Sequence, residues 1–562
     1  MPFLHLFQSF RKSPGFRPAL IALVVFGVIL AALDPAGDHR SGWDGPGMSV
    51  DEPLNVGQGV MLVDKLLDFD FKGFRQVDSA LTDYPPLGRV WIGICHEIAF
   101  LVNPPIDEVV PYSLTCARVS SAILFAVTIW WIGTAAARFW GPTAGVVASV
   151  ALVLMPRSFG HAHLANLETA INLAYAACLL FVCRRVPEML GADPIPPVGQ
   201  EQQRSTVPSS RSPARSVYWT TAIGAGVLMG LAFSIKVQAI FLPAALGAWA
   251  LLWLRWRAPA WLFVVGVVAA AVFFVGWPWL WDDPIQHAAQ YFGKTTNRVS
   301  IQAWYFGKAL ADRDVPWHYP WVMFGVSVPL GLHLLGLAST VDVLQSLRTT
   351  PRESLLAAGI LVPLVAFSVP GIAVYDGERL FSIVFPLWAL LIGRAAGRIV
   401  DWFAVRRWCG KPLALGVLMA FVAAQSIGLW RDQPAWLSYY SSAVGGLSGA
   451  DKLGLPATYW GDGVTRSLIA QIAELVPEES SIAVAPTLYE LQPLELERQA
   501  IPLKRRNIHL VSLGGAGGRD ATYLLLFNRP EYLPKEFRRL RPSDFVAVVE
   551  RDGVWLAGLL RK

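Results

Sequence analysis

Hydrophobic residues occur in long runs that repeat along most of the chain. Eleven apolar segments can be read, at 18–34, 113–137, 142–156, 166–183, 217–234, 237–254, 259–280, 321–344, 355–373, 380–393 and 412–429. A helix needs about 20 residues to cross a bilayer, and most of these segments approach that length. The pattern predicts a mainly α fold, a polytopic transmembrane bundle of about 11 spans.

Polar stretches divide the chain into four parts. Residues 1–34 are predicted to be a cytoplasmic tail and the first transmembrane helix, and residues 35–112 a long first external loop rich in Asp, Gly and Pro. The bundle, 113–429, contains a cytoplasmic linker at 187–216 that is rich in Pro, Gln, Ser and Arg. It also contains an external loop at 281–320.

The fourth part, residues 430–562, reads as a small external α/β domain. The stretches "SIAVAP", "YLLLF" and "DFVAVVERDGVWLAGLL" predict short strands, with helices such as 465–476 between them. In the first external loop, residues 89–102 are amphipathic and too short to span easily, so they predict a helix at the membrane interface.

Basic residues fix the expected orientation. The positive-inside rule places the N-terminus in the cytoplasm and the C-terminal domain outside, in a multi-pass protein of the inner (plasma) membrane. The first apolar run is expected to be retained as a signal anchor, with a cleaved signal peptide as the alternative. The basic residues of the cytoplasmic connections are Arg138, Arg184, Arg185, Arg204, Arg211, Arg215, Arg255, Arg257, Arg348, Arg352, Arg394, Arg398, Arg406, Arg407 and Lys411.

Composition agrees with a membrane protein. Charged residues make up 16% of the chain, against about 25% in soluble proteins. The net charge of +6 comes from basic residues at helix ends, so it does not indicate nucleic-acid binding. The five cysteines have no metal-ligand spacing and predict no disulfide framework.

Two adjacent carboxylates, Asp51 and Glu52, lie in the first external loop. In an extended stretch their side chains point opposite ways, so one can face a cavity while the other anchors the loop. A carboxylate in apolar surroundings can serve as a base, although solvated loop acids are the simpler alternative. In "DYPPL" (83–87) the prolines predict an extended entry into the next helix, and Asp83 is either functional or a helix cap.

The stretch "FGHAHLANLETA" concentrates polar residues at the outer start of the fourth span. It holds His161, His163, Asn166 and Glu168. A helix N-terminus there favours an anion. The alternatives are interface histidines with a helix cap, or a zinc site, which the H-x-H spacing supports only weakly.

Two cations lie at external turns between spans. Lys236 and Arg379 are suited to bind a phosphate at the membrane surface, and Asp376 and Glu378 flank Arg379. Snorkelling of long side chains at helix ends is the alternative.

The loop 281–320 is crowded with aromatic residues. An interfacial belt explains its tryptophans, but Tyr291, Tyr305, His318 and Tyr319 also have polar tips. Such side chains suit stacking on sugar rings and bonding to them.

The motifs, taken in their order along the chain, resemble those of a known family. The acidic pair and the Pro-Pro motif precede "FGHAHLANLETA", "GLAFSIKVQAIFLP", "PWHYP", "YDGERLF" and "YYSSAVGGLSGADKLGLPATYWGDG". Together they are similar to the bacterial glycosyltransferase family 39 group, relatives of the protein O-mannosyltransferases and the aminoarabinose transferase, in the glycosyltransferase C superfamily. The resemblance covers most of 40–465.

The resemblance implies a polyprenyl-phosphate sugar donor, a hydroxyl acceptor and inverting transfer on the non-cytoplasmic face. It carries the catalytic-base role to Asp51, with Glu52 as its partner, and it makes Lys236 and Arg379 candidates for holding the lipid phosphate. This chain has "DYPPL" where many relatives have His before the two prolines, and many relatives have another C-terminal region. No cofactor is fixed, and a divalent cation stays an open alternative.

Two other functions compete with a glycosyltransferase. A transporter or flippase should carry ionisable residues near mid-membrane and broken helices in paired halves, whereas the polar residues here gather at one face. A non-catalytic scaffold protein should keep its function when the charge of Asp51 is removed.

Overall fold

The computed structural model describes residues 12–37, 39, 42–106, 111–191, 215–297, 299–405 and 410–562. Most of the predicted cytoplasmic linker, and with it Arg204 and Arg211, lies outside the described residues. The same holds for Arg406, Arg407, Cys409 and the first eleven residues.

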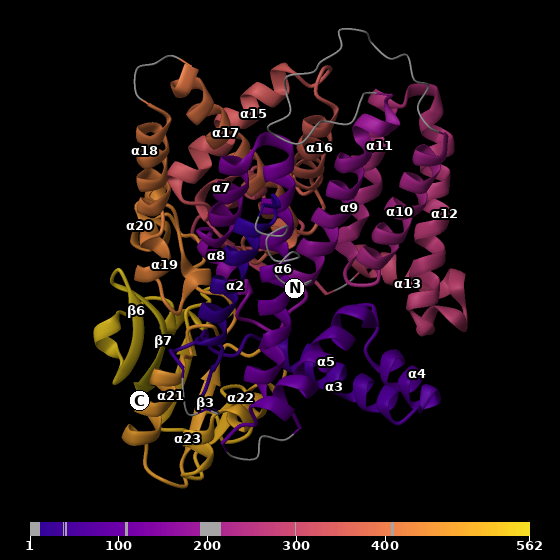
Figure 1. The fold of residues 1–562 in the computed structure, drawn as a ribbon. Helices are drawn as coiled ribbons and strands as arrows, with labels where there is room; N and C mark the ends of the chain where they lie inside the picture. The colour runs from indigo at the N-terminus through magenta and orange to yellow at the C-terminus, as the bar shows by residue number, and fades with distance from the viewer. Residues whose placement is uncertain are drawn as a thin grey trace, which may run out of the picture.

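Every predicted apolar segment contains a helix, although several helices are shorter than the predicted segment. The segment expected at 321–344 is two helices, because Val328 is extended and Pro329 precedes α15. The helices of the bundle are α2 (Phe16–Leu30), α6 (Leu114–Trp140), α7 (Pro142–Val153), α9 (Glu168–Met189), α10 (Arg215–Phe233), α11 (Phe241–Trp253), α12 (Ala258–Gly276), α14 (Tyr319–Ser327), α15 (Leu330–Gln345), α16 (Pro351–Ala366), α17 (Phe385–Val405) and α18 (Lys411–Ala424) (Figure 1).

The chain is a multi-pass membrane protein. Within the described ranges, six helices are long and apolar enough to cross a membrane, and four shorter apolar helices accompany them. The six run over Leu114–Trp140, Glu168–Met189, Ser216–Phe233, Arg255–Gly276, Arg379–Phe403 and Pro412–Arg431.

Three helices of the first predicted loop lie at one end of the bundle. They are α3 (Glu52–Leu67), α4 (Phe71–Ala80) and α5 (Pro86–Val102) (Figure 1). The two prolines of "DYPPL" act as expected: Pro85 is extended and Pro86 opens α5. One face of α5 leaves Ile98, Leu101 and Val102 exposed by 59%, 83% and 80%, which fits a helix at a bilayer interface.

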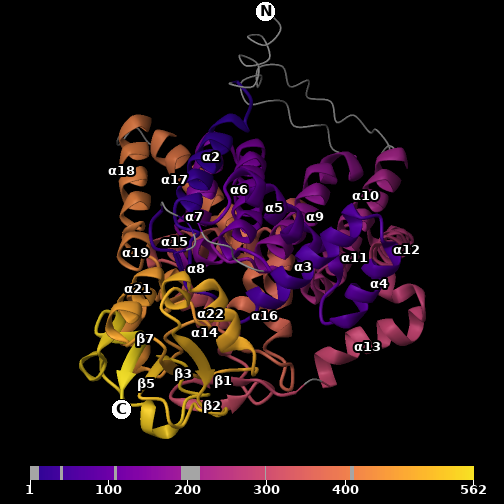
Figure 2. The same cartoon turned by 90° about the horizontal axis from the view of Figure 1, so that it is seen from below.

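The C-terminal region forms a five-stranded mixed sheet at the same end of the bundle (Figure 1), and Figure 2 shows the molecule from that end. Its order is β4-β3-β5-β7-β6; β4, β3 and β5 are parallel, and β7 runs antiparallel to β5 and β6. The strands are β3 (Ser481–Ala485), β4 (His509–Ser512), β5 (Tyr523–Phe527), β6 (Ala547–Arg551) and β7 (Val554–Arg561), with α21 (Arg466–Leu475), α22 (Gln492–Gln499) and α23 (Ile501–Lys504).

Short elements complete the connections. They are α8 (Pro156–His161), α13 (Pro284–Asn297), α19 (Ile427–Arg431), α20 (Gly446–Lys452), the hairpin β1 (Gln302–Tyr305) and β2 (Lys308–Ala311), and the 3-10 turns η1 (Val237–Ile240) and η4 (Arg379–Val384).

The sheet region is hydrogen-bonded to the first residues of α6. Gln499 of α22 accepts from the Leu114 backbone at 3.3 Å and donates to the Tyr112 carbonyl at 3.2 Å. The Tyr112 hydroxyl donates to Glu495 at 3.0 Å. The C-terminal region therefore packs against the bundle at the end where the site lies.

Candidate functional site

The two adjacent acids have different surroundings. They lie at the helical start of α3 and not in the extended stretch expected from the sequence, with Asp51 at φ −85°, ψ −19°. Their side chains still diverge. Glu52 is fully buried, whereas 27% of the Asp51 side chain is exposed.

Glu52 is held by Arg118 of α6. Both carboxylate oxygens accept from the Arg118 guanidinium at 2.8 Å, and they also accept the Ser49 and Ala165 backbone N–H groups at 2.8 Å. Arg118 further donates to the carbonyls of Leu33, Pro46 and Gly47. Both oxygens of this buried carboxylate are thus occupied by donors of the chain itself, which leaves neither open to a substrate. We therefore assign Glu52 to anchoring the loop beside Asp51.

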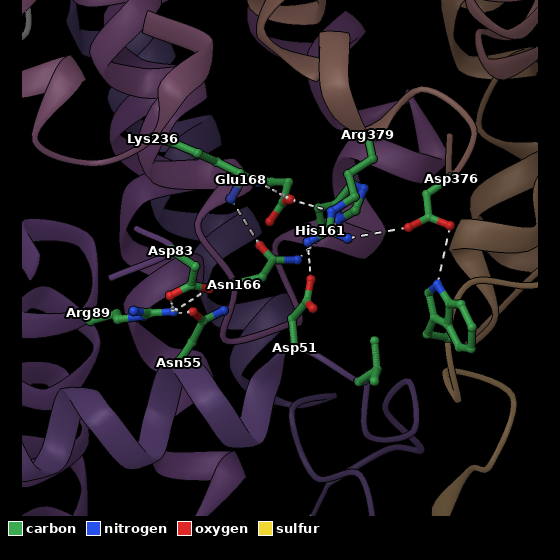
Figure 3. A network of polar contacts seen from close by, with 12 residues as sticks. Asp51, Asn55, Asp83, Arg89, His161, Asn166, Glu168, Lys236, Asp376 and Arg379 are labelled. Carbon is green, nitrogen blue, oxygen red and sulfur yellow. Dashed lines mark hydrogen bonds and ion pairs between the residues drawn. The ribbon is translucent and has the colours of Figure 1, made fainter. Parts of the chain in front are cut away.

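Asp51 belongs to a chain of charges that reaches into the bundle. Its Oδ2 accepts from Nη2 of Arg379, the first residue of η4 (Figure 3). The Arg379 Nε donates to Oε1 of Glu168 at 2.7 Å, and the Lys236 Nζ donates to the same oxygen at 2.6 Å. Asp51, Arg379 and Lys236 thus lie in one network, and Glu168 joins the two cations.

The start of α9 holds its own anion. Glu168 is in the first turn of α9, where unpaired N–H groups favour a negative charge. The sequence had indicated a site for an external anion there. In the structure the Glu168 carboxylate takes that place.

A tight turn before η4 positions the side chain of Arg379. Asp376 has φ +54° and Gly377 φ +67°, and a left-handed backbone is uncommon for Asp. The Asp376 Oδ2 lies 3.4 Å from Nη1 of Arg379, while its Oδ1 accepts from the Trp460 indole at 3.2 Å and from Arg529 Nη2 at 2.7 Å. The C-terminal region thereby holds the turn in place.

The aromatic loop supports the same turn. The Tyr319 hydroxyl accepts the Gly377 N–H at 2.9 Å, and the Tyr305 ring packs edge-on against Tyr319 at 4.9 Å. The Tyr305 hydroxyl is 2.7 Å from Nδ1 of His318. Tyr305, His318 and Tyr319, which the sequence had indicated as site residues, therefore pack next to the turn that precedes Arg379 and support that turn.

His161 and Asn166 lie on the inner side of the network. The Asn166 amide is 3.2 Å from Nδ1 of His161, and Asn166 Oδ1 accepts the Glu168 N–H at 3.3 Å. Nε2 of His161 lies 3.8 Å from Glu378, which pairs with Arg157. Burial lowers the pKa of His161, although Glu168 and Glu378 oppose the shift.

Asp83 forms a second cluster close to the first. It accepts from Nη2 of Arg89 at 2.9 and 3.1 Å, and Arg89 also donates to Asn55 at 3.1 Å (Figure 3). Between the clusters, the Tyr84 ring lies 5.3 Å from the Arg89 guanidinium and 5.4 Å from Lys236 Nζ. Burial raises the pKa of Tyr84 above its ordinary value.

Two predicted residues do not join the network. His163 has its Nδ1 2.8 Å from the Phe159 carbonyl, and its ring lies tilted against Trp436 with 4.3 Å between the ring centroids. Burial lowers the pKa of His163 to about 3, so this imidazole is neutral. Tyr291 is buried in an aromatic cluster with Phe273 and Trp277.

In the described part of the chain, two buried polar atoms close to Arg379 have no hydrogen-bond partner. Within the described residues, Oε2 of Glu168 and the hydroxyl of Tyr459 are buried and have no hydrogen-bond partner. Tyr459 lies over Arg379, with 5.6 Å between the guanidinium carbon and the ring centroid. Buried polar groups are nearly always paired, so these atoms indicate where a polar ligand or water bonds. A cavity of about 20 Å³ beside Tyr459, lined also by Asp376, Glu378 and Arg529, is large enough for one water.

The donor set does not favour a metal. Across the described ranges, no group of three or more His, Cys, Asp or Glu side chains could hold an ion. Asp51, Glu168 and Asp376 each face a cation of the chain instead. We therefore derive no step through the divalent cation that the sequence had left open.

Sequence reasoning missed several residues of the network. Arg118 is a charged residue inside the apolar run 113–137, which is itself a functional signal, and Arg157 lies next to the motif "FGHAHLANLETA". Tyr459 and Trp460 lie in "TYWGDG", a quoted motif without an assigned role. Arg529 has no local signal, because only the tertiary fold brings it to Asp376.

Comparisons with known proteins find likeness only in structure. No protein-family description matches the chain. No curated protein sequence matches it either. The chain is similar to ArnT from Cupriavidus metallidurans in the apo state, with 14% identity, 96% of this chain and 97% of that chain covered, and a TM-score of 0.48.

Two further structures are similar. ArnT from the same organism bound to undecaprenyl phosphate has 14% identity, coverage of 96% and 97%, and a TM-score of 0.46. The oligosaccharyltransferase AglB from Archaeoglobus fulgidus, in complex with an inhibitory peptide and a dolichol-phosphate, has 10% identity, coverage of 93% and 70%, and a TM-score of 0.49.

Proposed function

We propose that this protein is an integral membrane glycosyltransferase. It moves a sugar from a polyprenyl-phosphate donor to a hydroxyl acceptor, with inversion at the anomeric carbon. The observation that carries the proposal is the shared network: the part-exposed carboxylate of Asp51 and the cations Arg379 and Lys236 are joined through Glu168.

The chemistry needs a base and an anion site close together. The acceptor oxygen forms a bond to the anomeric carbon while the bond from that carbon to the phosphate oxygen breaks. The phosphate leaves with the electron pair, and the acceptor proton passes to Asp51. A single displacement needs only this base and inverts the centre. Groups aimed at the charge that develops on the phosphate lower the barrier most.

Asp51 is the member of the network suited to act as base. Its side chain is 27% exposed, whereas Arg379 is 8%, Lys236 3% and Glu168 1% exposed. In the structure Asp51 pairs with Arg379. An arriving phosphate competes for that guanidinium, and its binding frees Asp51 to accept a proton.

Arg379 and Lys236 are assigned to the donor phosphate. Arg presents a planar fork that suits phosphate oxygens, and Lys a compact charge. One oxygen of Glu168 accepts from both cations and holds them side by side, and its other oxygen has no hydrogen-bond partner among the described residues.

The network lies on the extracytoplasmic side in this proposal. The sheet and α3–α5 share one end of the bundle (Figure 1), and Asp51 lies there because it is the N-cap residue of α3. The opposite connections carry many of the basic residues, which the positive-inside rule assigns to the cytoplasm. The N-terminus is then cytoplasmic, the membrane is the inner one, and the sugar is transferred outside.

The test separates transfer from binding. Purified protein with a polyprenyl-phosphate sugar is assayed for release of the lipid phosphate, and product configuration is read by NMR. Lys236→Gln should weaken undecaprenyl phosphate binding, because it removes a cation from the phosphate site. A protein that binds this lipid, releases no sugar to any hydroxyl acceptor and moves lipid across vesicles would instead be a flippase.

A further inference from the structure

A groove lies between α6 and α9, far from the charge network. Its volume is about 280 Å³, and it is lined mainly by aromatic and aliphatic side chains of the two helices. Trp130 and Trp131 of α6 stay 41% and 38% exposed there. Phe181 of α9 forms the facing wall.

The groove is at the end of the bundle opposite the sheet. The start of α6 is bonded to α22, and the 27 residues of this helix extend it by about 40 Å at ~1.5 Å per residue. Arg138 is in its last turn. The groove therefore opens near the other membrane surface from Asp51.

Close packing of neighbouring helices shapes the walls. A Cβ on Gly224 of α10 would lie 2.4 Å from Phe181, and a Cβ on Gly15 would lie 3.3 Å from the Trp130 indole nitrogen. Glycine at these two positions lets α10 and the start of α2 approach without filling the groove.

Two arginines line the groove at its polar end. Arg138 and Arg184 are exposed, lie close enough to repel each other, and have no hydrogen bond or ion pair with any other described residue. Nearby arginines are paired: Arg185 bonds to Glu188 at 3.1 Å, and Arg352 donates to the Cys183 carbonyl at 3.1 Å.

These features complement one kind of molecule. An apolar slot in the hydrocarbon region suits an acyl chain, and two guanidinium groups at its rim suit a phosphate. An aromatic belt and snorkelling explain single Trp or Arg residues at a membrane edge. They do not explain why two unpaired, repelling arginines share one groove.

We propose that this groove binds a phospholipid with a negatively charged headgroup. One acyl chain lies against Trp130, Trp131 and Phe181, and the headgroup phosphate lies between Arg138 and Arg184. The bound lipid neutralises the two arginines and fills the slot between α6 and α9. The proposal does not depend on the glycosyltransferase reaction.

The test compares two lipids that differ only in headgroup. Purified full-length protein is titrated with phosphatidylglycerol or phosphatidylcholine of identical acyl chains, and bound lipid is counted by native mass spectrometry. Each arginine beside an anionic lipid contributes about a fivefold factor in affinity. We expect a preference for phosphatidylglycerol of roughly 30-fold. In the Arg138→Gln/Arg184→Gln variant this preference should fall close to one, chiefly because phosphatidylglycerol binding is lost.

The matched control is Arg255→Gln/Arg257→Gln, which removes two exposed arginines from the turn before α12. It should keep the preference. The single variants Arg138→Gln and Arg184→Gln, each losing about fivefold, provide the test if the double variant does not fold. Equal binding of the two lipids by the unaltered protein would overturn the proposal and indicate that protein fills the groove. An equal loss of preference in the control would overturn it as well.

Discussion

Arg529 connects the C-terminal region to the site, and its replacement gives a sharp prediction. Its guanidinium is 3% exposed, bonds to Asp376 at 2.7 Å and pairs with Glu531 at 2.8 Å. It also donates to the Thr458 carbonyl at 3.1 Å and lies 4.4 Å from the centre of the Trp460 ring. Arg529→Gln removes the charge from between two buried carboxylates.

The magnitude follows from these contacts. Breaking a buried ion pair by removing one partner costs about 3–5 kcal/mol, because the remaining charge is left uncompensated. Asp376 and Glu531 are both affected, so the free energy of unfolding should fall by about this amount. Among the described residues, Asp376 then keeps Trp460 and Arg379 as hydrogen-bond partners. It competes more strongly with a donor phosphate for Arg379, and we expect lipid-phosphate affinity to fall by roughly tenfold or more.

The assay measures both effects on one preparation. Thermal unfolding in detergent reports stability, and titration with undecaprenyl phosphate reports the dissociation constant. Arg529→Lys keeps the charge but cannot bridge the two acids as a fork, so it should fall between the unaltered protein and Arg529→Gln. Arg539→Gln, an exposed arginine of the same region, is the control and should change neither quantity.

One outcome would refute the reasoning. If Arg529→Gln lowers stability but binds undecaprenyl phosphate as tightly as the unaltered protein, Arg529 does not position Arg379. The C-terminal region would then only cover the site.

Three further predictions use other contacts. Tyr459→Phe should leave the unfolding temperature unchanged or raise it, because the buried hydroxyl has no partner among the described residues. The same variant should lower donor affinity or turnover, because this hydroxyl is assigned to bond the substrate. Unchanged binding and turnover would show that the Tyr459 hydroxyl does not contact the substrate. Lys236→Gln should weaken undecaprenyl phosphate binding by about 10- to 100-fold, the worth of a charge-assisted bond, and tight binding in titrations would assign the phosphate elsewhere. Burial raises the pKa of Asp462 to about 7, so the folded state binds the proton of this carboxyl more tightly than the unfolded state does. The stability that this proton contributes should be lost as pH rises from about 4 to about 7. Asp462→Asn should therefore flatten the profile of unfolding temperature against pH.

Much of the fold could be read from the sequence because bilayer physics leaves few choices. Apolar runs near span length must be helical, since backbone groups find no partners in lipid. The strands of the C-terminal region followed from short apolar runs such as "YLLLF", which is β5. The break at Pro329 was missed because the flanking residues are apolar on both sides, so hydropathy does not register the interruption.

The site could be predicted only in part. Asp51, Lys236 and Arg379 come from three distant segments and were grouped because each lay at the external face. Glu52 was expected to partner Asp51, but only the structure gives it Arg118 and saturates both oxygens. Long-range pairs of this kind depend on how helices pack, and no local pattern encodes them.

The role of Asp51 is the central claim, and turnover of Asp51→Asn tests it most directly. Asparagine is nearly isosteric but cannot take the acceptor proton. The account predicts that sugar transfer falls by about 10²- to 10⁴-fold, the usual contribution of a general base. Binding of undecaprenyl phosphate in the same preparation should be unchanged or tighter, because Arg379 loses a competing carboxylate. Transfer by Asp51→Asn at the rate of the unaltered protein would contradict the account.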